Sequence, residues 1–356
     1  MRTVLTRTGR PIDFFEVANR LVMKEPPFGR ISVEGLPNLI KGLHRDLVVN
    51  HAVRVQLPNL HEAEFVGIFS DYGGDDRASR YQTYSFLIAA LDGAHFVLDE
   101  LQVLRGTHGL TAPPREMAFK NLNYGPLFRA LPSWLNAVDK LPALLFTLLV
   151  DKRSHSVITA DSRSALKAFM ASARATGLVP PRTPEMTERA FRIASCVAYF
   201  TSLLCRESQT VIWLSDRDGS AANPTLTESL KRATMSLAAK VRPDLKVTFA
   251  FGTETELPRH GANYRELLSI PDLAAGALAQ GVSRAVPRAP GQRPQTDYSP
   301  SKLSTILRWM AIQRIGLKKT FFRCQPEGSG FRGAFGILEF DEIPDELTFV
   351  PIAYDK

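Results

Sequence analysis

The sequence predicts an α/β fold in which a central sheet is flanked by helices. Continuous apolar runs of the kind found in buried strands, such as residues 141–150 (LPALLFTLLV), alternate with longer segments of helical periodicity. Several of these runs end in an acid or a glycine, where a strand meets a turn. Both patterns are typical of strands and helices that alternate along one chain.

The expected elements follow one another from residue 64 onward. Strands are expected at 64–74, 81–93, 141–152, 209–219 and 245–253. Residues 94–106 suit either a strand or a helix. Helices are expected from about Arg115 and at 162–176, 184–207, 224–240 and 270–284, the last with Pro271 in its first turn.

Four regions are expected. Residues 1–60 read as a helical N-terminal extension with helices near 12–23 and 34–48, and residues 61–284 as the core. Residues 285–300, rich in Pro, Gly and Gln, read as a linker or mobile loop. Residues 301–356 read as a small C-terminal appendage, a basic helix followed by acidic strands.

Composition is that of a globular protein, with 44% hydrophobic and 22% charged residues in 356. Three cysteines without metal-ligand or paired spacing suit a reducing compartment, and Cys196 and Cys205 are expected in the core. The apolar run at 141–150 is too short to span a bilayer, and the run at 190–205 contains Arg192. We therefore expect a cytoplasmic protein without a membrane partner.

The positive charge is concentrated near the C-terminus. Residues 284–323 hold nine basic residues against one acid, Asp297, which accounts for the whole formal net charge of +8. Such a stripe attracts phosphates, so nucleic acid, DNA or RNA, is the expected partner, although a solvated helix face gives the same pattern. The residues expected to contact it are Arg293, Lys302, Arg308, Arg314, Lys318, Lys319 and Arg323.

Carboxylates follow three of the expected strands. Asp71, Asp151 and Asp216 each come at the end of an apolar run, with Asp218 close behind Asp216. An Asp in this position is often a turn or cap residue, and Asp218-Gly219 reads easily as a turn. Sites of α/β sheets are nevertheless built at such strand ends, so we expect some of these acids to converge.

Two further acids are expected to open helices near the same edge, Glu116 and Asp272. Each would also complement its helix dipole without any other role. Four or more converging carboxylates would repel one another unless divalent cations neutralised them. Oxygen-only ligation favours Mg²⁺ or Mn²⁺, and two such ions support phosphodiester hydrolysis.

The order of these motifs resembles a known family. The motifs follow the order seen in the RNase H-like family known as domain of unknown function 3800 (DUF3800). They are Asp-Tyr-Gly-Gly at 71–74, the strand TYSFLIAAL, Arg-Glu-Met-Ala-Phe-Lys at 115–120, Asp-Lys at 151–152, the acid at 216 and Pro-Asp-Leu-Ala-Ala-Gly at 271–276. The resemblance covers roughly residues 64–284. It implies an RNase H-like mixed sheet and a metal-dependent nuclease or related phosphoryl-transfer activity.

Carried over position by position, the resemblance implies a catalytic site. Asp71, Glu116, Asp216 and Asp272 match the expected metal ligands, with Asp151 as a further candidate. Lys120 is implied to hold a phosphate or to pair with an acid. Proteins with such cores often act in phage defence or in mobile elements.

The sequence departs from the family at two places. Tyr72 and Gly73 stand where the family commonly has Glu and Ser, and Ile270-Pro271 replaces the polar residue before the last Asp. A nucleic-acid-binding or scaffold protein with a decayed core is therefore the alternative to a nuclease. A glycosidase with two catalytic carboxylates is a third reading, which the few tryptophans, none beside the acids, disfavour.

Overall fold

The computed structural model describes most of the chain between residues 22 and 348. The described residues are 22–34, 36–51, 56–76, 79–111, 115–154, 156, 158, 163–179, 183–215, 224–253, 264–285, 301–328, 330–340 and 347–348. The helix expected near 12–23 and most of the expected linker fall outside them.

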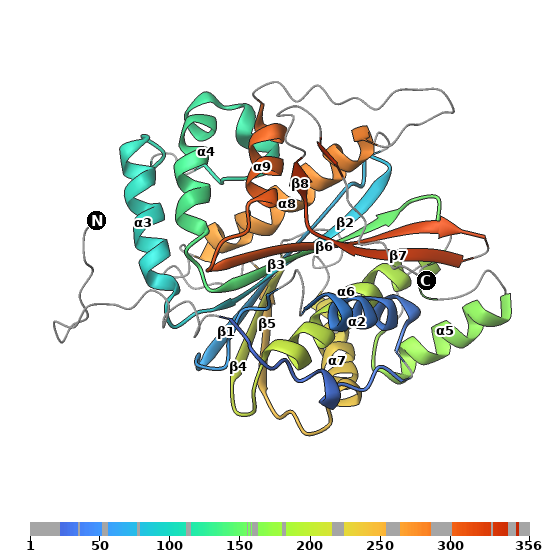
Figure 1. Ribbon diagram of the computed structural model, residues 1–356. Helices are drawn as coiled ribbons and strands as arrows, with labels where there is room; N and C mark the ends of the chain where they lie inside the picture. The colour runs from blue at the N-terminus through green and yellow to red at the C-terminus, as the bar shows by residue number, and fades with distance from the viewer. Residues whose placement is uncertain are drawn as a thin grey trace.

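Seven strands form one mixed sheet, in the order β5-β4-β1-β2-β3-β6-β7 (Figure 1). They are β1 (Phe65–Gly73), β2 (Tyr81–Ala90), β3 (Ala143–Asp151), β4 (Thr210–Ser215), β5 (Thr248–Thr253), β6 (Leu317–Glu327) and β7 (Gly330–Gly336). The β1–β2, β2–β3 and β6–β7 pairs are antiparallel, whereas β1–β4, β4–β5 and β3–β6 are parallel. β8 (Glu339–Phe340) and β9 (Leu347–Thr348) form a separate two-stranded pair.

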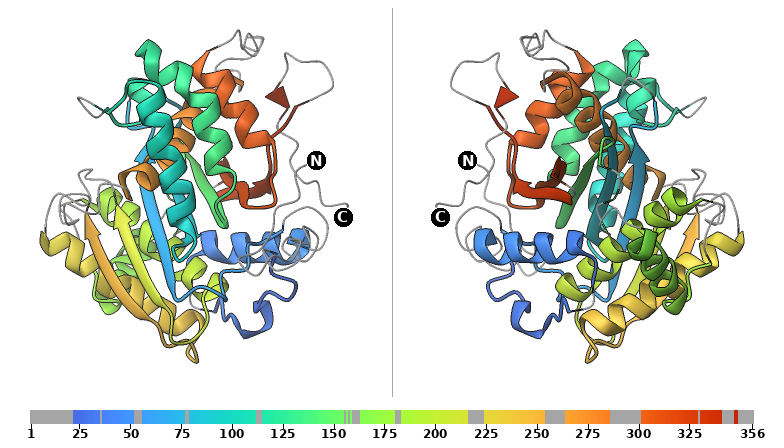
Figure 2. Two further views of the ribbon diagram at one scale, coloured as in Figure 1. Left: turned by 90° about the vertical axis from the view of Figure 1, so that its left-hand side faces the viewer. Right: turned by 90° about the vertical axis from the view of Figure 1, so that its right-hand side faces the viewer.

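Helices cover both faces of the sheet (Figures 1 and 2). One face carries α2 (Asn38–His51), α5 (Arg163–Ala175), α6 (Pro184–Leu204) and α7 (Pro224–Val241). The other carries α3 (Ala94–Thr107), α4 (Gly125–Val138), α8 (Tyr264–Ala285) and α9 (Lys302–Ala311). Two short 3₁₀ helices, η1 (Phe28–Arg30) and η2 (Phe119–Asn123), join these elements.

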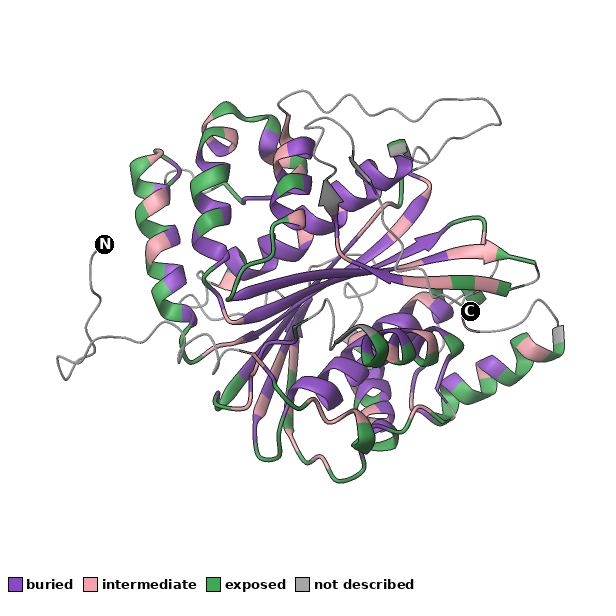
Figure 3. Cartoon of the chain, in the orientation of Figure 1, coloured by how far each residue is buried: buried purple, intermediate pink, exposed green. Residues whose placement is uncertain are grey.

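Because strand side chains alternate between faces, the sheet separates two hydrophobic cores. Ile68 and Phe86 belong to the core under α6, while Phe69 and Leu87 belong to the core under α8. β3 is buried along its whole length, as expected for a central strand of continuous apolar sequence. Figure 3 shows this burial across the middle of the sheet. No described helix combines the length and apolar character that a membrane span needs.

The α/β prediction is confirmed, with its expected strands at β1 to β5, and residues 94–106 form a helix, α3. Cys196 and Cys205 are buried as expected, and burial raises the pKa of each thiol to about 12.

Two helix starts differ from expectation. Residues 115–118 have no helical structure, and the next α-helix begins at Gly125, where Pro126 suits a first turn. Conversely, α8 begins at Tyr264 and holds Pro271 inside it. The added first turn is anchored by Glu266, which binds both Arg105 and the indole Nε1 of Trp134 at 3.0 Å. Tertiary contacts thus outweigh the local preference of proline for a helix start.

The C-terminal segment is not an appendage, because β6 and β7 complete the main sheet. Its two adjacent lysines look solvent-exposed in the sequence, yet Lys319 is only 1% exposed in β6. The Nζ of Lys319 donates to Oδ1 of Asp139 at 2.6 Å, and the Nε1 of Trp309 donates to the same oxygen at 2.8 Å. Burial lowers the pKa of Lys319 to about 8 while Asp139 opposes that effect, so the amine is still mostly protonated at neutral pH.

We expect Lys319→Met to lower the free energy of unfolding by about 3 kcal/mol, since it leaves Asp139 buried without its closest cation. Urea denaturation followed by circular dichroism measures the loss. Arg314→Gln is the matched control, because Arg314 binds the other oxygen of Asp139 at 3.4 Å but is 53% exposed. It should cost less than about 1 kcal/mol. Equal losses for the two variants would contradict a buried ion pair.

Candidate functional site

Asp71 lies on the central strand β1 and is 6% exposed. By strand alternation its side chain is on the same face as Phe69, the face covered by α8. The neighbouring row across the sheet is polar: Asp71 is aligned with Ser85, whose hydroxyl contacts that of Thr147 at 2.8 Å. These three polar groups interrupt the apolar face of the sheet at one level.

Helix α8 runs along β1 in the same direction, as two contacts show. The Phe69 and Tyr264 rings lie 6.1 Å apart, and a Cβ on Gly73 would be 3.4 Å from the Cβ of Ala275. The hydroxyl of Thr83 also donates to the carbonyl oxygen of Ala275 at 3.2 Å. These contacts fix the level of α8 against the strand.

The level of Asp71 follows from those two contacts. From Phe69 to Gly73 the strand advances about 13 Å, and from Tyr264 to Ala275 the helix advances about 16 Å, at their usual rise per residue. Asp71, midway along that stretch of strand, therefore faces the turn of α8 that ends at Asp272. The two acids come from segments about 200 residues apart in sequence.

Asp272 is half-buried, at the edge of α8 that faces η2. Its Oδ2 accepts a hydrogen bond from the backbone N–H of Phe119. The Phe119 ring fits against Gly276, where a Cβ would lie 2.5 Å from it, so the glycine allows η2 to approach the helix. On the other side of Phe119, the Nζ of Lys302 donates to its carbonyl oxygen at 3.0 Å.

Glu116 and Lys120 lie on either side of Phe119, in the segment that Asp272 holds. Both are exposed. Glu116 lies in the extended segment 115–118 before η2, so the expectation that it opens a helix is wrong. Asp272 thus binds the segment that holds Glu116 and Lys120 through the backbone N–H of Phe119, while Asp71 lies on the strand beneath the same stretch of α8.

Asp216 and Asp218 fall outside the described residues. The last residue of β4, Ser215, is aligned with Ser70 on β1.

Tyr72, which departs from the family pattern, and Gly74, which matches it, have different surroundings. Tyr72 points to the face opposite Asp71, where its hydroxyl contacts that of Ser70 at 2.9 Å and accepts from Ser215 at 3.3 Å. Gly74 has φ +80°, and a Cβ there would lie 2.0 Å from the carbonyl oxygen of Tyr81. Glycine is required at position 74, whereas residue 72 does not share the face of Asp71.

Asp151, the further candidate, is fully buried at the end of β3 and is bound by two arginines. Arg80 Nε donates to its Oδ2 at 2.9 Å, and Arg153 donates to both oxygens, at 3.1 and 2.9 Å. Burial raises the pKa of Asp151, but the hydrogen bonds from Arg153 and Arg80 outweigh it and hold the pKa below its ordinary value. Both oxygens of Asp151 are engaged by arginines, which gives this buried acid a structural role.

The expected basic stripe is divided by the fold. Lys318 is buried, its Nζ donating to Oε1 of Gln56 at 3.1 Å, and Lys319 is buried against Asp139, so neither is part of an exposed surface. Arg323 is partly buried in β6, and burial lowers its pKa. Arg308 and Arg314 are exposed, Lys302 lies beside the candidate site, and Arg293 falls outside the described residues.

The donor set at the α8 interface consists of carboxylates, which suits Mg²⁺ or Mn²⁺. Among the described residues, no three His, Cys, Asp or Glu side chains gather closely enough to hold a metal ion. Asp71, Glu116 and Asp272 therefore form no complete ligand set by themselves, and Asp216, the remaining candidate ligand, lies outside the described residues.

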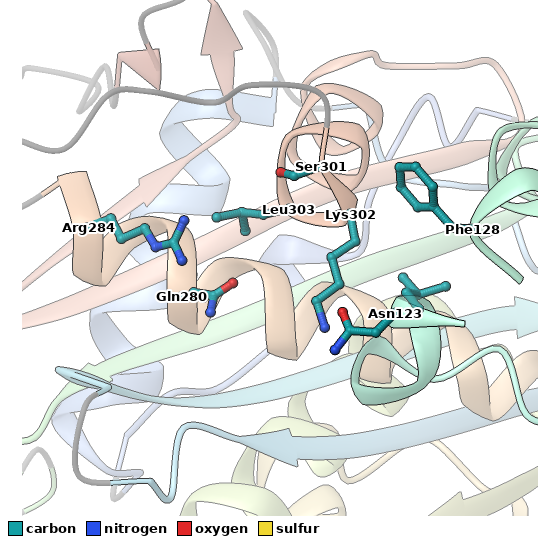
Figure 4. Close-up of a pocket in the computed structure, with 8 residues that line it drawn as sticks. Asn123, Phe128, Gln280, Arg284, Ser301, Lys302 and Leu303 are labelled. Atoms are coloured by element: carbon teal, nitrogen blue, oxygen red, sulfur yellow. The ribbon is translucent and has the colours of Figure 1, made fainter. Parts of the chain in front are cut away.

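The structure adds residues that sequence reasoning did not identify. A cavity of about 380 Å³ opens beside Lys302, with Gln280 and Arg284 of α8 and Asn123 of η2 in its wall (Figure 4). Arg284 belongs to the basic segment, so its charge could have indicated it from the sequence. Nothing in the sequence indicates Asn123 and Gln280, because their nearness to Lys302 arises only in the folded chain.

Comparison with known proteins adds no relative: no family model, curated protein or solved structure gave a match to this chain. The assignment of a site therefore depends on the geometry described above.

We expect Asp151→Asn to destabilise the fold by about 2 kcal/mol at neutral pH, because two guanidinium groups lose their carboxylate. The folded pKa of Asp151 is below the ordinary value of 3.8, so its stabilisation is complete well above pH 3.8 and is lost as pH falls through the folded pKa. The difference in unfolding free energy between wild type and variant should therefore shrink below pH 3.8. Urea denaturation at several pH values measures it, and a difference that stays constant down to pH 2 would contradict the ion-pair assignment.

Proposed function

We propose that this protein is a Mg²⁺- or Mn²⁺-dependent nuclease with an RNase H-like core. The proposal is supported by the packing of α8 on β1, which sets the buried Asp71 against the turn of α8 that ends at Asp272. Two acids from distant segments facing one interface in a largely apolar core repel each other, and a divalent cation between them would relieve that cost.

The sheet order supports the RNase H-like part of the proposal. The antiparallel strands β1, β2 and β3, with β4 and β5 parallel to β1 at its other side, are the arrangement expected of such a core. β6 and β7 extend the sheet beyond β3. Support also comes from Gly74, the one residue of the first motif that the backbone requires and that the family pattern shares.

The roles of the residues follow from their places. Asp71 and Asp272 would hold the cation together with Glu116 and Asp216. A bound pair of cations supplies an activated water and stabilises the leaving oxygen in phosphodiester hydrolysis. Lys302, fixed on the carbonyl oxygen of Phe119, and the exposed Lys120 are placed to hold substrate phosphates next to those acids.

A specific observation favours the alternative, a nucleic-acid-binding protein with a decayed core: the described residues contain no three-ligand group. Such a protein would bind nucleic acid through its basic residues without metal-dependent turnover. Isothermal titration with Mn²⁺ separates the two functions, because only the nuclease needs a site with useful affinity for the ion.

Asp71→Asn and Asp272→Asn should each reduce Mn²⁺-dependent cleavage by at least about 100-fold, since each removes a ligand charge with little change in shape. Cleavage of RNA, DNA and RNA–DNA hybrids is measured with and without a chelator. Asp99→Asn is the matched control, an exposed acid on α3 on the same side of the sheet, and it should leave the rate unchanged. Full activity in both site variants would exclude the proposed centre.

A further inference from the structure

The cavity beside Lys302 lies where three separate segments meet: η2 with the start of α4, the C-terminal half of α8, and the N-terminus of α9. Its volume is about 380 Å³, which is within the range of small-ligand sites. Its wall is formed by Leu122, Asn123, Phe128, Gln280, Arg284, Ser301, Lys302 and Leu303. Figure 4 shows the amine end of Lys302 reaching from α9 toward Asn123, with Gln280 and Arg284 rising from α8.

The chemistry of this wall is that of an anion site. Two side chains are cationic, two are carboxamides, one is a hydroxyl, and none of the lining residues is acidic. Arg284 is exposed and forms no ion pair with a described residue. Lys302 uses one of its three N–H donors on the carbonyl oxygen of Phe119 and lies 4.6 Å from the centre of that ring, which fixes its position at the cavity.

The end of α9 adds to this field. Ser301 caps the helix in a reciprocal pair with Ser304, so the first turn is held in place with its positive dipole end at the cavity. Leu122, Leu303 and Phe128 form an apolar part of the wall. An anionic group with an attached apolar or aromatic part would match both the cationic part and the apolar part of the wall.

We propose that this cavity binds a phosphate group. One part of this proposal rests on the proposed function, namely that the phosphate belongs to a polynucleotide. Gln280 and Arg284 lie about 12 and 18 Å further along α8 than Asp272, so the phosphate held here belongs to a nucleotide further along the strand than the scissile one. Phe128 is then in reach of an attached base or sugar.

Titration calorimetry in the presence of a chelator tests the proposal, with inorganic phosphate and a short single-stranded oligonucleotide as separate probes. Arg284→Gln and Lys302→Gln should each weaken binding of at least one probe by about ten-fold, because each removes a charge-assisted hydrogen bond. Arg284→Gln is the decisive variant, since an exposed side chain without an ion pair to a described residue can be replaced without unfolding the protein. Lys240→Gln on α7, an exposed lysine on the opposite side of the sheet, removes the same charge and should change nothing.

The two probes identify the source of the phosphate. Loss confined to the oligonucleotide assigns the cavity to the polynucleotide, and loss confined to inorganic phosphate assigns it to a free phosphate. If Arg284→Gln binds both probes as tightly as Lys240→Gln does, the phosphate site is refuted. Asp71→Asn should retain phosphate binding, so failure of the nuclease proposal and failure of the phosphate site are told apart.

Discussion

The packing of α8 along β1 and β2 is the contact on which the candidate chemistry depends. It sets the turn of α8 that ends at Asp272 against β1, Gly276 of the same helix makes room for the Phe119 ring, and the helix continues to Gln280 and Arg284 at the cavity. A rigid helix on a rigid strand fixes such positions better than loops do. Loss of this packing would separate the acids from each other and from the cavity.

Most buried charges in the described part of the chain are neutralised by partners with a structural role. Asp151 is bound by Arg80 and Arg153, Lys319 by Asp139, and Glu266 by Arg105. The Arg80–Asp151, Lys319–Asp139 and Arg105–Glu266 pairs join segments that are distant in sequence, and they anchor the end of β3, the start of β6 and the first turn of α8. The fold thus pairs these buried charges across segments that are distant in sequence.

Local patterns were sufficient to predict the strands and the α/β class, because continuous apolar runs such as 143–151 have few alternatives. They also identified Asp71 and Asp272. They failed where distant partners decide the outcome. Lys318 and Lys319 read as exposed because Asp139, the partner of Lys319, is 180 residues away, and α8 starts earlier than expected because Glu266 is held by Arg105 and Trp134. The sequence did not predict the cavity for the same reason, because its wall combines three separate segments.

The central claim is that Asp71 and Asp272 share a divalent cation. A crystal soaked in Mn²⁺ and measured at the manganese absorption edge tests it most directly. The account predicts an anomalous peak within about 2.5 Å of carboxylate oxygens of both residues, with Asp216 or Glu116 completing the shell. Full ordering of these acids with no peak between Asp71 and Asp272 would contradict it.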